Sequence, residues 1–597
     1  MLERTNDSQL QALGIDSKYV FLYQRWKELL HKQTRDMHQY RIHNSLTLLD
    51  EMISVVNARL EEVYLTDHNI CSCLEELIQL IKDDIILSKY YPVVNNYLKK
   101  KLEKLSKKDK FSISEKKDLK NTCEYILLEL KKSYFNNALK ELKNAINQND
   151  LHAVEAYSYI AISHCIFGGW SPQELGNVVR VFMGNKNPEE KWNEFEAILS
   201  KVNTDHIILI SIALKPGTSW LTEQDALASI GINVCQPQEL IEEYKSHCDL
   251  SRTLNNTKKY AKVEVVAPDV ISAAHFGIKS IAEKMDTASF FNIIKPWDID
   301  VVTIVVINKS NWFVKPLTGM SIYQTYDYID SSNDIFLNTK GLFSNSDKQQ
   351  IAKRLSTTFT YANISRASFF QEAKFLNMWV ALEALARSDI HDSIIDSVKE
   401  TVSSSICLRY YYRLFRNFYE DCNRCKVKFD FSSVNFDFTQ YTGNEIAKKI
   451  IVILKDPGLT NELEAKCGVN SLLLYRYKEL NLLVRDVDKV YIKITNHNSR
   501  IKWQIQRLYR IRNEIAHSAL QTTSSLVIYI EHLYDYLACF ITEIVMCNNI
   551  DELSSMNHIY SVINDNYNYY IKECSNRRVT NDRIDSFYAT GTMRFLP

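Results

Sequence analysis

Residues that end helices and form tight turns are scarce in this sequence. Its 597 residues include 14 glycines and 10 prolines, and no proline lies between Pro316 and Pro457. Such a shortage favours long helices over many short strands. Because a chain of this length exceeds the size of one hydrophobic core, we expect two to four domains, a mostly α fold and an all-helical C-terminal half.

The chain also lacks an excess of charge of either sign. Lys plus Arg and Asp plus Glu both number 72. Net charge therefore gives no general argument for nucleic-acid binding, and any RNA-binding surface has to be local. Hydrophobic residues at 46% and charged residues at 24% are typical of a folded globular protein.

Long apolar runs and a secretory signal are missing as well. Residues 1–9 are polar, the apolar run 207–214 is short, and the run 526–546 is interrupted by ionisable residues. A helix that spans a bilayer needs about 20 apolar residues, so we expect no contact with a membrane. The thirteen scattered cysteines are typical of free thiols in a reducing cytoplasm, where we expect the protein to act.

Motifs that hold nucleotides or metals are absent or incomplete. No GxxxxGK[ST] loop and no GxGxxG loop occurs, which argues against a nucleotide-driven motor. Cys422 and Cys425 could supply two zinc ligands, but no second CxxC or HxxxH pair follows at the spacing of a zinc finger. We therefore predict no metal and no other cofactor.

Hydrophobic periodicity divides the first part of the chain into two regions. In residues 1–204 apolar residues recur at helical spacing, which predicts an N-terminal helical region. Residues 205–345 contain β-branched runs of strand length, at 206–214, 261–267 and 300–307. With Asp269 placed to cap a helix between two of these runs, this region is predicted to be a small α+β domain with a sensor or regulatory role.

Helical periodicity returns in residues 346–548. Between residues 369 and 385, five large apolar side chains recur every three or four positions, which predicts an amphipathic helix. These are Phe375, Met378, Trp379, Leu382 and Leu385. Further helices are predicted at 394–419, 444–454, 471–483, 499–519 and 526–547. The Asn- and Tyr-rich residues 549–597 are predicted to form a weakly organised tail.

One short segment, Arg510 to His517, combines groups suited to phosphate chemistry. An arginine, an amide and a histidine within two helical turns can hold a phosphate and move a proton. On a helix, Arg510, Asn513 and His517 share a face, opposite an apolar stripe that runs from Ile501 to Ala519. Arg512 leans toward that stripe. Since a buried unpaired cation is costly, we expect Arg512 to snorkel to the surface, to be paired, or to complete a site with a second subunit.

The residues before this segment are basic. No acidic residue occurs from Ile492 to Ile511, which predicts a positive helix face. Arg500, Lys502 and Arg507 are the candidate RNA-binding residues on this face.

Two other patterns can be read in two ways. The seven lysines between Lys99 and Lys110 are interpreted as a solvated helix and loop, with an RNA contact as the alternative. Tyr410 to Tyr412 are interpreted as packing residues, with base stacking as the alternative.

The segment from Arg512 to His517 resembles the R-x4-6-H signature of the HEPN superfamily of helical ribonucleases. Lys374 to Leu385 is similar to the first helix of the Apea-like HEPN branch of bacterial anti-phage defence proteins. The resemblance covers residues 350–548 and implies a metal-independent RNA endonuclease that acts as a homodimer. It assigns His517 as general acid or base and Arg512 as the phosphate-binding residue. Asn513 would orient either the histidine or the phosphate, and Arg510 and Glu383 are supporting candidates.

The resemblance leads us to expect a defence ribonuclease that cleaves host RNA, with tRNA as one candidate substrate. Its activity would cause abortive infection when a phage-derived trigger appears, and the N-terminal and middle regions would restrain it before then. The alternative is a non-catalytic HEPN-like bundle that dimerises and binds nucleic acid or a partner, with the middle domain as sensor.

Overall fold

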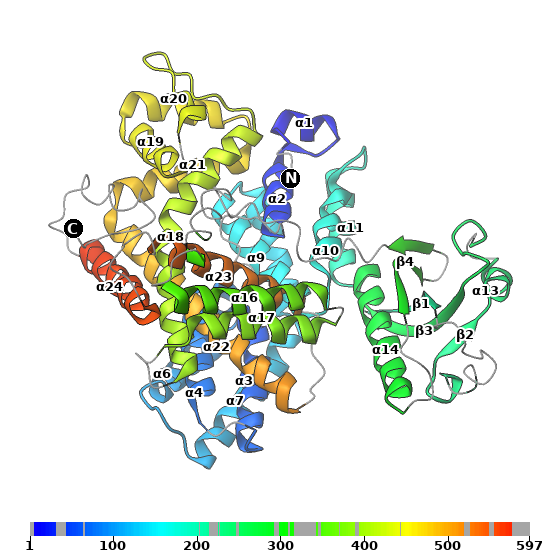
Figure 1. Ribbon diagram of the computed structural model, residues 1–597. Helices are drawn as coiled ribbons and strands as arrows, with labels where there is room; N and C mark the ends of the chain where they lie inside the picture. Colours follow the sequence, from blue (N-terminus) through cyan, green and yellow to red (C-terminus); the bar gives the residue numbers. More distant parts are fainter. Residues whose placement is uncertain are drawn as a thin grey trace.

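The chain is mostly helical and carries one small antiparallel sheet in its middle region, as the sequence predicts (Figure 1). The computed structural model describes residues 5–30, 43–63, 66–201, 203–213, 225, 227–245, 250–291, 298–308, 311–315, 339, 342–343, 348–368, 370–388, 393–441, 443–518, 526–547 and 555–575. No helix in these ranges is both long enough and apolar enough to cross a bilayer.

The N-terminal region is a helical domain with its own apolar core. Its helices are α1 (Asp7–Ala12), α2 (Ser17–Leu29), α3 (Ser45–Leu60), α4 (His68–Asp83), α5 (Ile85–Tyr90), α6 (Pro92–Leu105), α7 (Ile113–Lys131), α8 (Tyr134–Asn147), α9 (Leu151–Phe167), α10 (Pro172–Val178), η1 (Val179–Phe182) and α11 (Pro188–Leu199). Side-chain caps mark where several helices begin, as where Ser112 and Glu115 form a capping box at α7. Trp26 and Trp192 lie fully inside the core.

The middle region is an α+β domain set to one side of the helical mass (Figure 1). Its elements are β1 (Thr204–Ala213), β2 (Asn233–Cys235), α13 (Pro237–Tyr244), β3 (Lys259–Ala267), α14 (Val270–Phe290), β4 (Asp298–Asn308) and β5 (Asn311–Lys315). The strand order is β2-β3-β1-β4-β5, with antiparallel pairing throughout. The three predicted strands are confirmed as β1, β3 and β4, and Asp269 caps α14 as predicted.

Two layers cover this sheet. One face packs on α14 and the other on α13 and on Leu250 and Leu254. A Cβ on Gly277 of α14 would lie 2.6 Å from a side-chain carbon of Ile208. The glycine therefore lets α14 approach β1 closely. The short strands β2 and β5 were not predicted.

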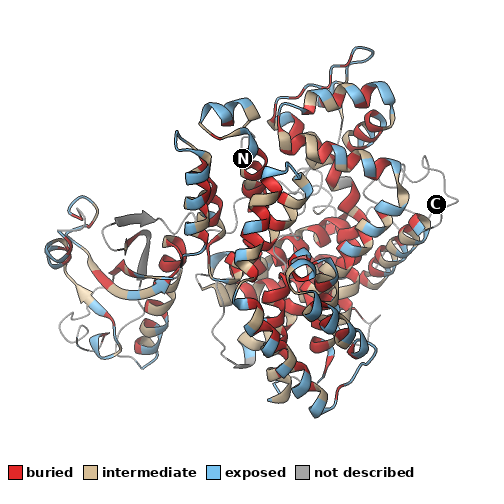
Figure 2. Cartoon of the chain, turned by 180° about the vertical axis from the view of Figure 1, so that it is seen from behind, coloured by how far each residue is buried: buried red, intermediate tan, exposed pale blue. Residues whose placement is uncertain are grey.

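The C-terminal helices share one large core. They are α16 (Gln349–Ala367), α17 (Gln371–Ala386), α18 (Ile394–Arg424), η4 (Phe438–Gln440), α19 (Gly443–Lys455), α20 (Pro457–Cys467), α21 (Ser471–Arg485), α22 (Val487–Ser518), α23 (Leu526–Cys547) and α24 (Met556–Ser575). All five predicted core residues of α17 have no exposed surface. Figure 2 shows buried residues concentrated where these helices face one another.

The prediction of a weakly organised tail at 549–597 is wrong for residues 556–575. These residues form α24, and Ile559, Tyr560 and Ile563 are fully buried in the C-terminal core. The Tyr560 hydroxyl donates a hydrogen bond to the carbonyl of Leu385 in α17. The Asn and Tyr residues that suggested a tail occupy both faces of an ordinary packed helix.

Buried contacts join the N-terminal and C-terminal helical regions. Arg476 of α21 lies between Glu28 of α2 and Asp421 of α18, with almost no exposed surface. Leu472 and Ile528, from two C-terminal helices, pack into the N-terminal core. The helical regions therefore share a continuous interface.

The middle domain contacts the helical regions through α14 and its capping residue. The carboxylate of Asp269 accepts hydrogen bonds from the Ser171 amide at 2.7 Å and hydroxyl at 2.9 Å. Lys279 of α14 pairs with Glu372 of α17 at 2.7 Å. Both contacts involve α14, so this helix connects the sheet to the helical regions.

Candidate functional site on helix α22

The candidate segment lies at the C-terminal end of α22, a helix of 32 residues. Its predicted apolar stripe is confirmed for the described residues, because Ile501, Ile505 and Leu508 are fully buried. Ile511 and Ile515 are half-buried against the same core, while Ala519 lies outside the described residues. This stripe fixes the rotation of α22 against the C-terminal helices.

The N-terminal domain contacts the opposite face of α22 between Trp503 and Arg510. Gln506 donates a hydrogen bond to Asn69 at 2.9 Å, and the Trp503 indole donates one to Glu75 at 3.2 Å. Both acceptors belong to α4, and helices α22 and α4 pack together. The predicted positive face of α22 therefore packs against the N-terminal domain at Trp503 and Gln506.

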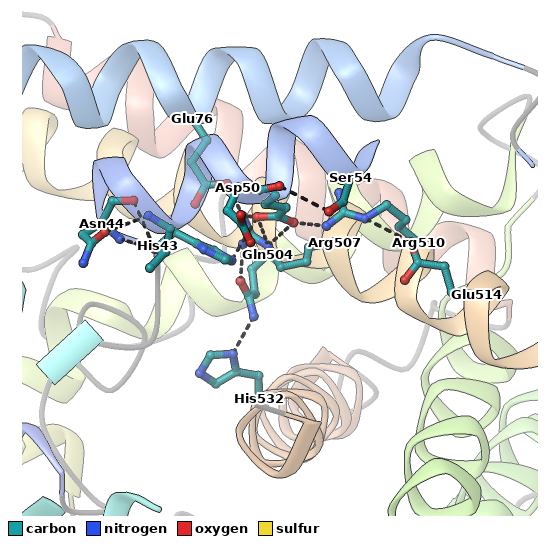
Figure 3. A network of polar contacts seen from close by, with 12 residues as sticks. His43, Asn44, Asp50, Ser54, Glu76, Gln504, Arg507, Arg510, Glu514 and His532 are labelled. Carbon is teal, nitrogen blue, oxygen red and sulfur yellow. Dashed lines mark hydrogen bonds and ion pairs between the residues drawn. The ribbon is translucent and has the colours of Figure 1, made fainter. Parts of the chain in front are cut away.

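Arg507 is held by two acidic residues of the N-terminal domain (Figure 3). Its Nε lies 2.8 and 3.0 Å from the two carboxylate oxygens of Glu51, and its Nη2 lies 2.9 Å from Glu51 and 2.5 Å from Glu76. Nη1 donates a hydrogen bond to Gln504 at 2.7 Å. All three guanidinium nitrogens are engaged and the side chain is 3% exposed. Arg507, a predicted RNA-binding residue, therefore lies in the interface between the domains with its guanidinium bonded to protein groups.

Arg510 joins the same network. Its Nη2 donates a hydrogen bond to Glu51, and its Nε lies 3.7 Å from Glu514 one turn later on α22. The residue is buried. Arg510 was predicted to share a helix face with Asn513 and His517. It lies in the interface between the domains, where Glu51 accepts its hydrogen bond.

His43 completes this buried polar cluster. Its Nε2 lies 2.9 Å from Glu51, and its ring stacks on Phe167 with centroids 3.8 Å apart. Burial, followed by the positive charge of Arg507, holds the pKa of His43 well below its ordinary value. A neutral His43 leaves two arginines and two glutamates in the cluster, so the buried charges balance.

The cluster continues toward α23 through an amide. The Gln504 side chain accepts from Arg507 and lies 2.8 Å, nitrogen to nitrogen, from Nδ1 of His532. His532 is buried. Polar contacts thus run from α3 and α4 through α22 to α23, as the side chains in Figure 3 show.

Arg512 and Asn513 lie beyond the part of α22 that contacts the N-terminal domain. Nη1 of Arg512 donates a hydrogen bond to Oδ1 of Asn513 at 3.0 Å, and both residues are half-buried. The helix continues through His517 to Ser518, so it does not end before the histidine. The side chain of His517 lies outside the described part of the structure. Arg512 is thus hydrogen-bonded to a neutral amide within its own helix.

Glu383, a supporting candidate for the site, is hydrogen-bonded within its own helix. Its carboxylate accepts a hydrogen bond from the Trp379 indole at 2.8 Å, and Trp379 packs against Tyr509 of α22. Among the described residues no ion pair joins Glu383 to Arg510 or Arg512. The carboxylate satisfies the hydrogen-bonding group of a buried indole.

The remaining basic candidates differ in their surroundings. Lys502 pairs with Glu400 of α18 at 2.6 Å. Arg500 is half-buried. Acidic residues of α3, α4 and α18 thus neutralise much of the positive charge of the basic segment 492–511 of α22.

The alternatives for aromatic and cysteine residues can also be assessed. Tyr410 and Tyr411 are buried, and Tyr410 stacks on His497, in agreement with the packing interpretation. Burial, followed by a hydrogen bond with Cys467, raises the pKa of the Cys422 thiol. Within the described ranges no group of three or more His, Cys, Asp or Glu residues is arranged to hold a metal. All described cysteines are free thiols.

Sequence reasoning missed Glu51, Glu76 and His43. The available signal was an acid inside each of two strongly apolar helices, since Glu51 precedes Met52 and Glu76 lies between Leu74 and Leu77. Buried acids require partners, but the sequence does not show which cations supply them. No protein-family model, curated protein or solved structure matches this chain.

Proposed function

We propose that this protein is a metal-independent RNA endonuclease of the HEPN type that acts in anti-phage defence by cleaving host RNA, with tRNA as a candidate substrate. The observation that carries the proposal is the pairing of Arg512 with Asn513 at the end of α22. This pair lies just past the last residue held by the N-terminal domain, and His517 follows Asn513 by one helical turn.

The chemistry follows from these residue types. Arg512 binds the scissile phosphate, because its planar guanidinium stays charged and offers several donors besides the one bonded to Asn513. His517 accepts the proton of the ribose 2′-hydroxyl as that oxygen attacks phosphorus, or donates a proton to the leaving 5′-oxygen. Asn513 fixes Arg512 in place, which reduces the entropy lost when the phosphate binds.

The surrounding bundle supports a rigid site. Helix α22 packs on α18 and α17, and α17 and α18 both pack on α23. Residues on well-packed helices hold catalytic geometry better than residues on loops. In the proposed homodimer a second copy contributes its own Arg512 and His517 to a shared cleft.

The test is cleavage of purified total RNA in the presence of EDTA. Wild-type protein is expected to cut RNA, whereas His517→Ala and Arg512→Ala are expected to leave it intact. His558→Ala, at an exposed histidine of α24, and Arg485→Ala, at an exposed arginine of α21, are matched controls that should cleave normally. Equal cleavage by His517→Ala and wild type would remove the catalytic proposal.

A non-catalytic role is the second candidate, and the neutralised face of α22 favours it. Arg507 and Arg510 serve an interface between domains instead of a ligand. In this case the helical bundle binds RNA or a partner without cutting it. RNA binding would then be sensitive to salt and survive His517→Ala, and no strand scission would be seen.

A further inference from the structure

The outer surface of α6 and α7 exposes an unusual number of large apolar side chains. Val93 is 81% exposed, Tyr97 53%, Tyr125 67% and Leu128 65%. These residues belong to a continuously described segment, and the buried sides of the same helices already pack in the N-terminal core through residues such as Leu98 and Ile126. The exposed groups are therefore additional to the residues that fold these helices.

The exposed residues follow one line along each helix. On α6, Val93, Tyr97, Lys100 and Lys104 recur at intervals of four, three and four residues, so they share one face. On α7, Tyr125 and Lys132 lie seven residues apart and share a face by the same rule. Each line places apolar or aromatic groups first and lysines after them along the same face.

Lys101 connects the two lines. Its Nζ lies 2.5 Å from the Thr122 hydroxyl and 2.8 Å from the Asp118 carboxylate, both on α7. The same Nζ lies 5.8 Å from the centre of the Tyr97 ring on α6. Tyr125 follows Thr122 by three residues on α7. The two tyrosines thus flank one bridge between the helices and form part of one surface.

This surface is basic within a protein of zero net charge. Residues 92–132 contain 12 lysines and 6 acidic residues, which gives a net charge of +6 for this segment. Lys100, Lys104, Lys107 and Lys110 are exposed, and none of them has an ion-pair partner among the described residues. Phosphate groups are the anions that such a field would attract.

We propose that this α6–α7 surface binds single-stranded RNA. Tyr97 and Tyr125 stack on bases, and the unpaired lysines contact the phosphate backbone. Aromatic and basic groups that share one surface suit a single strand because every base offers a face for stacking. A membrane-binding helix instead inserts a continuous apolar face into lipid, whereas the exposed apolar residues of α6 and α7 share their faces with lysines.

This surface lies on the N-terminal domain and adds an RNA-binding site separate from the motif on α22. It rests on the proposed function only in the choice of RNA over DNA. Binding at this surface would recruit the strand, and the proposed cleavage chemistry would remain with Arg512 and His517.

The test is fluorescence anisotropy of the full-length His517→Ala protein with a labelled 12-nucleotide oligo(U). Tyr97→Ala combined with Tyr125→Ala is expected to weaken binding at least tenfold. The two Tyr→Phe changes keep the rings and should bind as well as the parent. Lys100→Gln with Lys104→Gln should lower the slope of log K against log salt by about 0.7 per lysine. Lys245→Gln, at an exposed lysine of the middle domain, is the matched control.

Several outcomes would overturn the proposal. Unchanged binding by the double Tyr→Ala variant would show that RNA binds elsewhere. Tighter binding to oligo(dT) than to oligo(U) would assign the surface to DNA. Binding to vesicles containing anionic phosphatidylglycerol in place of RNA would assign it to membranes, and loss of a dimer in the Tyr→Ala variant would assign it to a second copy. Because binding is measured without cleavage, failure of the nuclease test would leave this result interpretable.

Discussion

Glu51 of α3 accepts hydrogen bonds from both Arg507 and Arg510 of α22, although more than 450 residues separate it from either arginine in the sequence. One carboxylate therefore ties the N-terminal domain to the helix that carries the proposed motif. Arg507 has Glu76 as a second partner, and Arg510 has Glu514. Glu51 is the residue that the two arginines share.

Glu51→Gln is expected to destabilise the protein. The change removes the shared carboxylate and leaves Arg507 with Glu76 and Arg510 with Glu514 at 3.7 Å. Breaking a buried ion pair typically costs about 3 to 5 kcal/mol. The midpoint of thermal or urea unfolding should fall for the transition that includes the N-terminal domain. Asp50→Asn changes the neighbouring residue, whose side chain is 64% exposed, and should leave the midpoint unchanged. Equal effects of the two substitutions would contradict the role of Glu51.

Features of this fold that depend on neighbouring residues could be predicted from the sequence, and contacts between distant segments could not. The stripes on α17 and α22 could be predicted because helical periodicity depends only on neighbouring residues. The partners of Arg507 and Arg510 could not be predicted. Helical periodicity shows which way a side chain points but not which distant residues pack against that face. Helix α24 was missed because its composition resembles a polar tail. The hydrogen bond of Arg512 to Asn513 involves adjacent residues of one helix.

The buried cluster also predicts a dependence of stability on pH. The pKa of His43 is lowered in the folded protein, so below its ordinary value near 6.5 the unfolded chain binds a proton that the folded chain does not. Stability contributed by His43 is therefore present above about pH 6.5 and is lost as the pH falls below it. The half-buried residues His164 and His275, each with a pKa lowered to about 4 by desolvation, act in the same direction.

His43→Phe is expected to reduce this pH dependence. Phenylalanine preserves the stacking on Phe167 and cannot be protonated, so the fall in unfolding free energy between pH 7 and pH 5 should be smaller than in wild type. Urea unfolding at several pH values measures this difference. His558→Phe, at an exposed histidine, is the control and should keep the wild-type slope. A slope unchanged by His43→Phe would exclude His43 as a contributor.

Asp269→Ala is expected to loosen the middle domain. Besides the two bonds from Ser171, the carboxylate accepts bonds from the amides of Ile271 and Ser272 at 2.9 Å, so it both caps α14 and joins the domains. Losing the cap costs about 1 kcal/mol, and the unsatisfied groups of Ser171 add to it. Limited proteolysis should cut between the N-terminal and middle domains faster than in wild type. Asp456→Ala removes a comparable cap from α20 and should leave that cleavage rate unchanged.

Arg510 and Arg512 are expected to behave differently when each is replaced by glutamine. Arg510 is buried between Glu51 and Glu514, so Arg510→Gln should lower the unfolding midpoint. Any loss of RNA cleavage should then track the fraction of unfolded protein and recover at lower temperature. Arg512 is half-buried and contacts Asn513 among the described residues, so Arg512→Gln should leave the midpoint nearly unchanged.

Arg512→Gln should nevertheless abolish cleavage at every temperature, because glutamine cannot supply the positive charge that stabilises the reacting phosphate. Arg512→Lys separates charge from geometry, since lysine keeps the charge but loses the planar fork. We expect Arg512→Lys to retain a small part of the activity. If Arg510→Gln instead abolished cleavage in fully folded protein while Arg512→Gln remained active, the phosphate-binding role would pass to Arg510, and the bond to Glu51 would have to open during catalysis.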